Sequence, residues 1–190
     1  MKLVVISRPD FFKDETHTLN RLFGQGLERL HLRKPNASRE QLAKWIEEID
    51  SAYRSWIVVH DHHDLALEYG LGGIHLNSRN PNIPDWLDRS RFTLSRSCHT
   101  IAEVEACQGD FDYVFLSPIF DSISKQGYQA GFTKEELADA KARGILSKNV
   151  YALGGITFEN LQEVERLGFE GAAMLGGFWT SEERRERNTL

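Results

Sequence analysis

Short apolar runs alternate with longer, more polar stretches from one end of the chain to the other. The run Trp56-Ile57-Val58-Val59 has no polar interruption, which is typical of a strand that is covered on both faces of a parallel sheet. Similar runs recur at intervals along the sequence. The pattern predicts strands at residues 3–6, 29–32, 56–59, 74–76, 92–95, 113–116, 150–153 and 172–175.

The stretches between these runs have helical periodicity. In residues 38–53, apolar side chains stand at positions 42, 45, 46 and 49, which is the spacing of one helix face. Ser38, with Gln41 three residues later, matches the pattern of a capping box at the start of a helix. Helices are predicted at residues 16–25, 38–53, 65–67, 101–107, 134–146 and 158–167.

This alternation of strands and helices predicts a parallel sheet with right-handed crossovers. About eight such units that close on one another form an α/β fold, the (β/α)8 TIM barrel. A chain of 190 residues makes a compact barrel with short loops. The alternative, an open doubly wound sheet, requires a glycine-rich turn after the first strand, and residues 6–10 contain no glycine. We predict a single TIM-barrel domain over residues 1–180 and a charged tail at residues 181–190 that frays.

Composition and charge narrow the functional class. The chain has 23 basic and 28 acidic side chains, with a formal net charge of −5. An acidic balance argues against a protein that binds nucleic acid through a basic face. No apolar run approaches the roughly 20 residues that span a bilayer, and two cysteines do not make a disulfide framework. We therefore expect a cytoplasmic protein with neither a nucleic-acid nor a membrane partner.

Polar side chains gather where the predicted strands end. In a TIM barrel the catalytic groups lie at the carboxyl ends of the strands and in the loops that follow them. The candidates at these positions are His31, Arg33 and Lys34 after the second strand, His60 and Asp61 after the third, His75, Asn77, Ser78 and Asn80 after the fourth, and Ser97 and His99 after the fifth.

Two pairs of glycines follow the last two strands, Gly154-Gly155 and Gly176-Gly177. Glycine lets backbone N–H groups approach an anion without interference from a Cβ atom, and this edge of a TIM barrel commonly binds phosphate. We expect a phosphate site here, with the alternative that the glycines only make tight turns. Three residues of the neighbouring loop add hydroxyl groups and a positive charge to this candidate site: Ser122, Ser124 and Lys125.

The other charged groups suggest an anion site and a metal site. Arg33 and Lys34 offer a second anchor for phosphate, unless they are solvated loop cations. Asp61 is a carboxylate that helps to hold Mg²⁺ if substrate phosphates supply the other ligands. Histidines on consecutive strands, at positions 31, 60 and 75, provide the residue types of a zinc triad, although their spacing does not require one.

Taken in order along the chain, these residues resemble the family of thiamine-phosphate synthases, also called thiamine-phosphate pyrophosphorylases, and thiazole tautomerases. The resemblance extends from Leu3 to about Trp179. It rests on Leu32-Arg33, Asp61, Gly73-Ile74-His75-Leu76, Arg96-Ser97-Cys98-His99, Ser117-Pro118-Ile119-Phe120, Ser122-Ile123-Ser124-Lys125 and Ala152-Leu153-Gly154-Gly155-Ile156.

The resemblance implies a (β/α)8 transferase of thiamine biosynthesis. Such an enzyme joins hydroxymethylpyrimidine pyrophosphate to a thiazole phosphate alcohol, giving thiamine phosphate and pyrophosphate. Carried over by position, Arg33, Ser97 and Lys125 are catalytic, and Asp61 helps to hold Mg²⁺. The positions implied for substrate binding are His31, Lys34, His60, His99, Ser122, Ser124, Gly154, Gly155, Gly176 and Gly177. A homodimer is also compatible with the sequence.

The sequence departs from the synthase pattern at several positions. The family's Gln-Leu-Arg-Glu-Lys is His31-Leu32-Arg33-Lys34-Pro35 here, and the position of a second metal carboxylate is the neutral Asn80. Two alternatives therefore stay open, a thiazole tautomerase of the same family and a catalytically silent binder of thiazole phosphate. In the tautomerase branch the acid–base histidine falls at Pro118, so His99 or His31 would have to serve instead.

Overall fold

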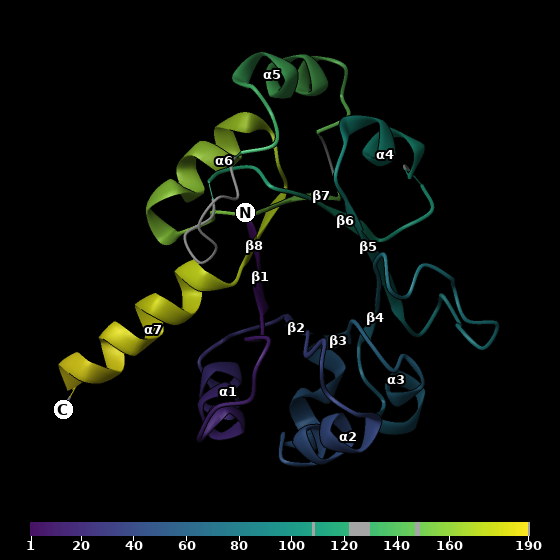
Figure 1. Ribbon diagram of the computed structural model, residues 1–190, viewed down its shortest axis with the longest axis vertical. Helices are drawn as coiled ribbons and strands as arrows, with labels where there is room; N and C mark the ends of the chain where they lie inside the picture. The colour runs from purple at the N-terminus through teal and green to yellow at the C-terminus, as the bar shows by residue number, and fades with distance from the viewer. Residues whose placement is uncertain (108, 122–129, 147–148, 190) are drawn as a thin grey trace. The chain divides into compact units, whose positions relative to one another are not determined.

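The computed structural model describes residues 1–107, 109–121, 130–146 and 149–189. Eight strands follow one another around a closed sheet in the order of the chain, and helices lie between them except between β4 and β5, which a loop over residues 77–92 connects (Figure 1). The prediction of a (β/α)8 barrel is confirmed, and the open doubly wound alternative is not. The strands are β1 (Lys2–Ile6), β2 (Leu30–Leu32), β3 (Ile57–Val59), β4 (Gly73–Leu76), β5 (Thr93–Cys98), β6 (Tyr113–Leu116), β7 (Val150–Leu153) and β8 (Gly171–Met174).

The chain divides into two compact units, and the first consists of residues 6–95. Here β2, β3 and β4 pair in parallel, with His31 opposite Val58 and Val59 opposite Ile74. The helices of this unit lie outside these strands (Figure 1). They are α1 (Glu15–Gly24), α2 (Arg39–Glu47), the 3-10 helix η1 (Ser51–Trp56) and α3 (Asp64–Tyr69).

The predicted helix over residues 38–53 is two helices. Its start is as predicted, because Ser38 and Gln41 form a capping box. The α-helix ends at Glu47, and Asp50 then accepts a hydrogen bond from the Ala52 N–H and begins η1. The Asp50 N–H itself donates to Asn20 Oδ1 of α1 at 2.9 Å. These polar contacts between α1 and the turn replace the continuous helix that the apolar spacing alone predicts.

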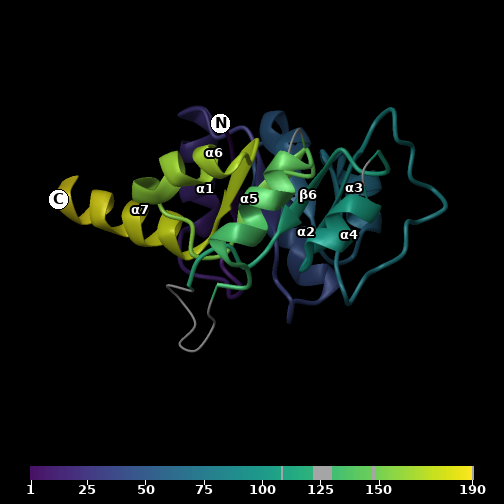
Figure 2. The same cartoon turned by 90° about the horizontal axis from the view of Figure 1, so that it is seen from above.

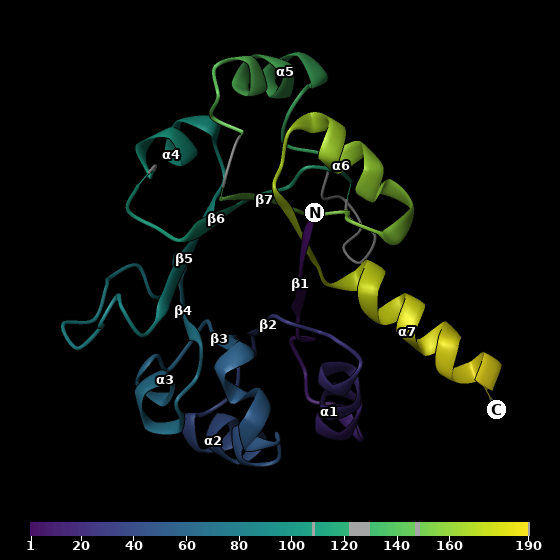
Figure 3. The ribbon, with the colours of Figure 1, turned by 180° about the vertical axis from the view of Figure 1, so that it is seen from behind.

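The second unit contains residues 1–5 and 96–190. Its strands β6, β7 and β8 pair in parallel, and β8 pairs with the start of β1, so that Lys2 lies opposite Gly171. Figure 3 shows α4 (Ile101–Ala106), α5 (Lys134–Ala142) and α6 (Leu161–Leu167) outside these strands. Thr100 with Glu103, and Thr133 with Glu136, form capping boxes that fix the starts of α4 and α5.

The last helix, α7 (Gly176–Thr189), begins two residues after β8 and extends away from it (Figure 2). It includes the charged tail at residues 181–190 up to Thr189, so the fraying of this tail stays a prediction. None of the helices described in the two units is long and apolar enough to cross a membrane.

Candidate active site

The end of β2 directs neighbouring side chains to opposite faces of the sheet. Side chains two positions apart in a strand share a face, so His31 and Arg33 are expected on one side and Lys34 on the other. His31 contacts His60, whereas Lys34 contacts Glu15 at the start of α1. The side chains of Arg33 and Lys34, which are adjacent in the sequence, therefore lie in different environments.

Three histidines from consecutive strands meet on the face of the sheet that His31 occupies. His31, His60 and His75 are 0%, 4% and 0% exposed. His31 Nδ1 and His60 Nε2 are 2.9 Å apart and share a hydrogen bond, and the rings of His60 and His75 stack with centroids 4.2 Å apart. His75 Nδ1 hydrogen-bonds to Ser95 Oγ at 2.9 Å. The hydrogen bonds fix the orientation of these rings in a buried polar cluster.

Burial determines the protonation of this cluster. Desolvation lowers the pKa of His31 and of His60 well below the usual value, and electrostatic repulsion from the neighbouring His75 ring adds to both shifts. Both rings are therefore neutral near pH 7, and each then carries one N–H donor and one acceptor nitrogen. Such a pair can hydrogen-bond to a polar heteroaromatic ring, or its nitrogens can bind a transition metal.

Among the described residues, His31, His60 and His75 form a group of three side chains whose nitrogens lie close enough together to hold a metal ion. One nitrogen from each of the three rings lies within 4.8 Å of the others. The hydrogen bond between His31 and His60 uses one nitrogen of each ring. The geometry is compatible with the zinc triad considered from the sequence, and it equally satisfies the three rings by hydrogen bonding without an ion.

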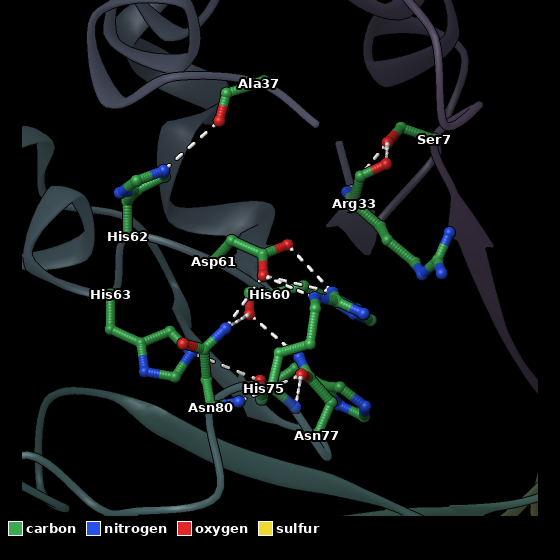
Figure 4. A network of polar contacts seen from close by, with 11 residues as sticks. Ser7, Arg33, Ala37, His60, Asp61, His62, His63, His75, Asn77 and Asn80 are labelled. Carbon is green, nitrogen blue, oxygen red and sulfur yellow. Dashed lines mark hydrogen bonds and ion pairs between the residues drawn. The ribbon is translucent and has the colours of Figure 1, made fainter. Parts of the chain in front are cut away.

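Asp61 follows His60 and lies at the carboxyl edge of the same strands (Figure 4). Its carboxylate is held by Arg79, whose Nη2 is 3.1 Å from both carboxylate oxygens and whose Nε is 3.2 Å from Oδ1. Asn80 Nδ2 donates a further hydrogen bond to Oδ1 at 2.8 Å. Asp61 is thus paired with a guanidinium group, in a loop that the sequence predicted as a metal site.

Arg33 lies near this pair and is anchored through its backbone. Its N–H donates to Ser7 Oγ at 2.9 Å, and the Ser7 hydroxyl donates to the Arg33 carbonyl oxygen at 3.2 Å (Figure 4). Burial lowers the pKa of the Arg33 guanidinium, the charge of Arg79 lowers it further, and Asp61 opposes the shift. A guanidinium remains charged at every ordinary pH, so Arg33 is a fixed cation at this edge.

Lys34, which was predicted to bind substrate, directs its ammonium group to partners inside the protein. Lys34 Nζ donates to both carboxylate oxygens of Glu15 at 2.7 Å and to the Asp10 carbonyl oxygen at 2.9 Å. Trp45 Nε1 donates to the same carboxylate at 3.0 Å. The ammonium group has three N–H donors, and these contacts occupy all of them. Lys34 therefore stabilises the packing of α1 and α2 against the sheet.

In the second unit, the glycine pair after β7 lies against the end of β6. Gly154 and Gly155 have φ values of +94° and +65°, a region that favours glycine. A Cβ atom on Gly154 would lie 2.8 Å from Pro118 Cα, and one on Gly155 would lie 2.4 Å from the Asp121 carbonyl oxygen. Glycine is therefore required at both positions for the backbones to approach.

The glycine pair after β8 begins α7. The helix starts at Gly176, and a Cβ atom on Gly177 would lie 2.3 Å from the Ile156 carbonyl oxygen. The first turn of α7 therefore packs next to the segment that follows Gly155. Free N–H groups and the helix dipole at such a terminus favour an anion, and the first turn carries no acidic residue. The two predicted glycine pairs are brought together.

Two of the remaining predicted residues, Ser97 and His99, lie in and directly after β5. His99 Nδ1 lies 3.3 Å from the Ser117 carbonyl oxygen and 3.4 Å from its hydroxyl, and Ser97 lies in β5. Burial raises the pKa of Cys98, between them, to about 12, so this thiol is not a nucleophile. The predicted residues Ser122, Ser124 and Lys125 lie outside the residues that the structure describes.

Arg79 is the residue that the sequence analysis did not select. Its position was informative, because it stands in the loop after β4, three residues beyond Leu76.

A separate cavity of about 320 Å³ lies at the opposite, amino-terminal ends of the strands in the same unit, where Arg29, Gly72 and Arg91 contribute to its wall. It lies away from the predicted site residues.

Comparison with known proteins identifies the family. The family model for thiamine monophosphate synthase matches residues 3–178. The chain belongs to this family. A solved structure of thiamine phosphate pyrophosphorylase from Bacteroides thetaiotaomicron is 40% identical, with a TM-score of 0.84 over 95% of this chain and 85% of that one.

Two more distant relatives agree with this assignment. Thiamine-phosphate synthase from Listeria welshimeri is 27% identical over 143 residues, which are 73% of this chain and 68% of that protein. Thiamine phosphate pyrophosphorylase from Pyrococcus furiosus has the same fold, with a TM-score of 0.70, 21% identity and coverage of 92% of this chain and 85% of that one. Membership of the thiamine monophosphate synthase family confirms the predicted class, a transferase of thiamine biosynthesis.

Proposed function

We propose that the protein is a thiamine-phosphate synthase that joins hydroxymethylpyrimidine pyrophosphate to a thiazole phosphate alcohol. In this reaction the bond between the pyrimidine methylene carbon and the pyrophosphate oxygen breaks, and both electrons leave with pyrophosphate. The thiazole ring nitrogen then supplies the electron pair of the new carbon–nitrogen bond. The products are thiamine phosphate and pyrophosphate.

The observation that carries the proposal is the family match over residues 3–178. The relatives named above carry the names of the synthase or pyrophosphorylase, which does not favour the tautomerase alternative. A catalytically silent binder of thiazole phosphate differs from the synthase only in that it forms no product. A cytoplasmic location and a homodimer belong to the proposal as predictions.

Each half of the reaction makes a distinct demand on the protein. His31 and His60 keep the pyrimidine-binding role that the resemblance implies; both rings are neutral, and the hydrogen bond between them uses one nitrogen of each. We assign Arg33 to the pyrophosphate, whose negative charge grows as the bond breaks. A fixed guanidinium stabilises that charge more in the transition state than in the ground state.

For the thiazole half, the glycine pairs keep the phosphate-binding role that the resemblance implies. The Gly154-Gly155 and Gly176-Gly177 pairs, with the start of α7, would bind the thiazole phosphate through backbone N–H groups. Ser97 and His99 are assigned to contacts near the reacting centre. Ser122, Ser124 and Lys125 keep the predicted roles that the resemblance implies, with Lys125 neutralising pyrophosphate.

Magnesium is the cofactor that the resemblance implies, and the residues around Asp61 do not fit it. A magnesium ion needs oxygen ligands and is usually held by one or two free carboxylates. The Asp61 carboxylate is instead bound on both oxygens by the Arg79 guanidinium. The neighbouring side chain of Asn80 directs its amide N–H group, a donor, at the same carboxylate.

The test is a direct assay for thiamine phosphate. The protein is incubated with both phosphorylated substrates, once with Mg²⁺ and once with EDTA, and the product is detected by chromatography and mass. We expect thiamine phosphate and pyrophosphate in equal amounts, with a matched loss of both substrates. The Arg33→Gln variant serves as the control that lacks the assigned cation.

Two results would contradict the proposal. Absence of thiamine phosphate under both conditions, with thiazole phosphate still bound, would leave the silent binder. Isomerisation of a thiazole carboxylate phosphate without any joining to the pyrimidine would establish the tautomerase.

A further inference from the structure

The loop after β4 holds one arginine in a fixed position over the end of β3. The Asn77 N–H donates to the Asn80 carbonyl oxygen at 3.2 Å, and the Asn80 N–H donates back to the Asn77 carbonyl oxygen at 3.0 Å. The side-chain amides of both residues donate to the His60 carbonyl oxygen, at 2.9 and 3.0 Å (Figure 4). Asn77 Oδ1 accepts the Arg79 N–H at 2.9 Å. The backbone of Arg79 is thus tied to the turn that carries it.

The Arg79 side chain is in turn fixed by Asp61. The guanidinium forms three contacts of 3.1–3.2 Å with the carboxylate, and the Asp61 side chain is only 14% exposed. The Arg79 side chain is 41% exposed. A guanidinium has five N–H donors in a rigid plane, and the contacts with Asp61 use Nε and Nη2. Nη1 takes part in none of the hydrogen bonds found within residues 6–95, the unit to which Arg79 belongs.

The balance of charge at this edge favours an anion. Arg33 and Arg79 are both permanently charged. Figure 4 shows Arg33 on the same edge as Asp61, the carboxylate that the Arg79 guanidinium binds, and the charge of Arg79 lowers the pKa of Arg33. The Asp61 carboxylate pairs with Arg79 and neutralises one of the two guanidinium groups. One positive charge is left over, and guanidinium groups bind phosphate oxygens through paired hydrogen bonds.

We propose that Arg79 takes the place of a divalent metal ion at this site, so that Arg33 and Arg79 bind pyrophosphate together without magnesium. Asp61 is then a positioning residue that orients the Arg79 guanidinium, and it is not a metal ligand. The inference rests on the proposed function for the identity of the anion. The paired arginines neutralise the charge that develops on the departing pyrophosphate, whose oxygen receives both electrons of the broken bond.

The test measures the binding of inorganic pyrophosphate by isothermal titration calorimetry. The wild-type protein is titrated in EDTA and in excess Mg²⁺ at the same ionic strength. Arg79→Gln removes the charge, Arg79→Lys keeps the charge but not the planar fork, and Arg39→Gln is the matched control. Arg39 lies in the same unit and is also bound to carboxylates, those of Asp64 and Glu68. Thermal melting confirms that each variant is folded.

We expect wild-type affinity in EDTA to lie within about threefold of that in Mg²⁺. Arg79→Gln weakens binding by about tenfold to a hundredfold, as expected for the loss of a charge-assisted contact of about 1.5–3 kcal/mol. Arg79→Lys falls between these values, and Arg39→Gln binds as the wild type does. The comparison of EDTA with Mg²⁺ uses the wild-type protein alone and decides the matter even if a variant fails to fold.

Three results would overturn the inference: pyrophosphate affinity that is lost in EDTA and restored by Mg²⁺, an Arg79→Gln variant that binds like the wild type, or a wild-type protein that binds pyrophosphate under neither condition. Failure of the proposed function gives a different result. If pyrophosphate binds in EDTA through Arg79 and no thiamine phosphate forms, the anion site stands and the synthase assignment falls. If thiamine phosphate forms only with Mg²⁺, the synthase assignment stands and the metal-independent anion site falls.

Discussion

Two groups of charged side chains lie near the end of β2 and differ in what they bind. Lys34 and Glu15 form a buried ion pair, whereas Arg33 and Arg79 lie at the carboxyl edge with Asp61. Lys34 and Glu15 are 0% and 2% exposed, and all donors of the ammonium are satisfied within the protein. Arg79 pairs with the Asp61 carboxylate at a partly exposed edge, and Arg33 lies on the same edge without an ion pair of its own to that carboxylate. The first region is balanced in charge and the second is not. An excess of positive charge at a strand end is available to a ligand, whereas a balanced buried pair serves the fold.

The pKa shifts express the same difference. Burial raises the pKa of Glu15 and lowers that of Lys34, and in both cases desolvation exceeds the favourable contact with the partner. Each group therefore depends on its partner to remain charged, and removal of one leaves a buried charge without compensation. Arg33 does not depend on a partner in this way, because a guanidinium stays protonated at any pH in which the protein is folded.

The largest expected effect comes from breaking the buried pair. Glu15→Ala leaves the Lys34 ammonium buried without its carboxylate, and we expect the free energy of unfolding to fall by about 3–5 kcal/mol. Replacing both, with Glu15→Leu and Lys34→Met, removes the charges together and should restore much of that loss. Urea denaturation of the single and double variants measures both values.

Arg39→Gln is the matched control for this experiment, because Arg39 also pairs with carboxylates but on the surface of the same unit. An exposed pair is screened by water and salt, so we expect no measurable change in the denaturation midpoint. A Glu15→Ala variant as stable as the wild type would show that the buried pair does not support the fold.

A smaller effect concerns the dependence of stability on pH. Burial keeps the pKa of His31 well below 6.5 in the folded protein, so the unfolded chain binds a proton that the folded chain does not. The stability that this histidine contributes is present above pH 6.5 and is lost as the pH falls through that value. The free energy of unfolding should decrease by about 1.4 kcal/mol per pH unit for this group.

His31→Gln tests this dependence, since glutamine does not titrate. Urea denaturation between pH 7 and pH 5 should show a slope that is smaller than that of the wild type by about 1.4 kcal/mol per pH unit. His17→Gln, at an exposed histidine outside the cluster, is the control for the substitution itself. An unchanged slope in His31→Gln would mean that His31 is protonated in the folded protein.

The fold was predictable because each strand and helix of a (β/α)8 barrel leaves a local signal. Unbroken apolar runs such as 56–59 mark buried parallel strands, and capping boxes at Ser38 and Thr100 mark helix starts. The glycine pairs were predictable for a similar reason, since they follow the last two strands directly. Positive φ at Gly154 and Gly155 gives the physical basis of that signal.

The roles of the individual cations were less predictable. Lys34 is withdrawn from the site by Glu15, a partner 19 positions away on another element, which no local pattern reveals. Arg33 and Lys34 follow β2 directly, and an alternation that continues past Leu32 would place them on opposite faces and could have separated them. Arg79 was missed because its role depends on Asp61, 18 positions earlier, and its pairing with that carboxylate appears only in three dimensions.

The most direct test of the account compares Arg33→Gln with Lys34→Met for both stability and turnover. We predict that Arg33→Gln unfolds at the same urea concentration as the wild type and forms thiamine phosphate about 10²–10³-fold more slowly, the usual consequence of losing one preorganised donor. Lys34→Met should be strongly destabilised, yet turn over at nearly the wild-type rate at a temperature where it is folded. The reverse outcome, a stable Lys34→Met without turnover and an active Arg33→Gln, would contradict the division of roles between these two neighbours.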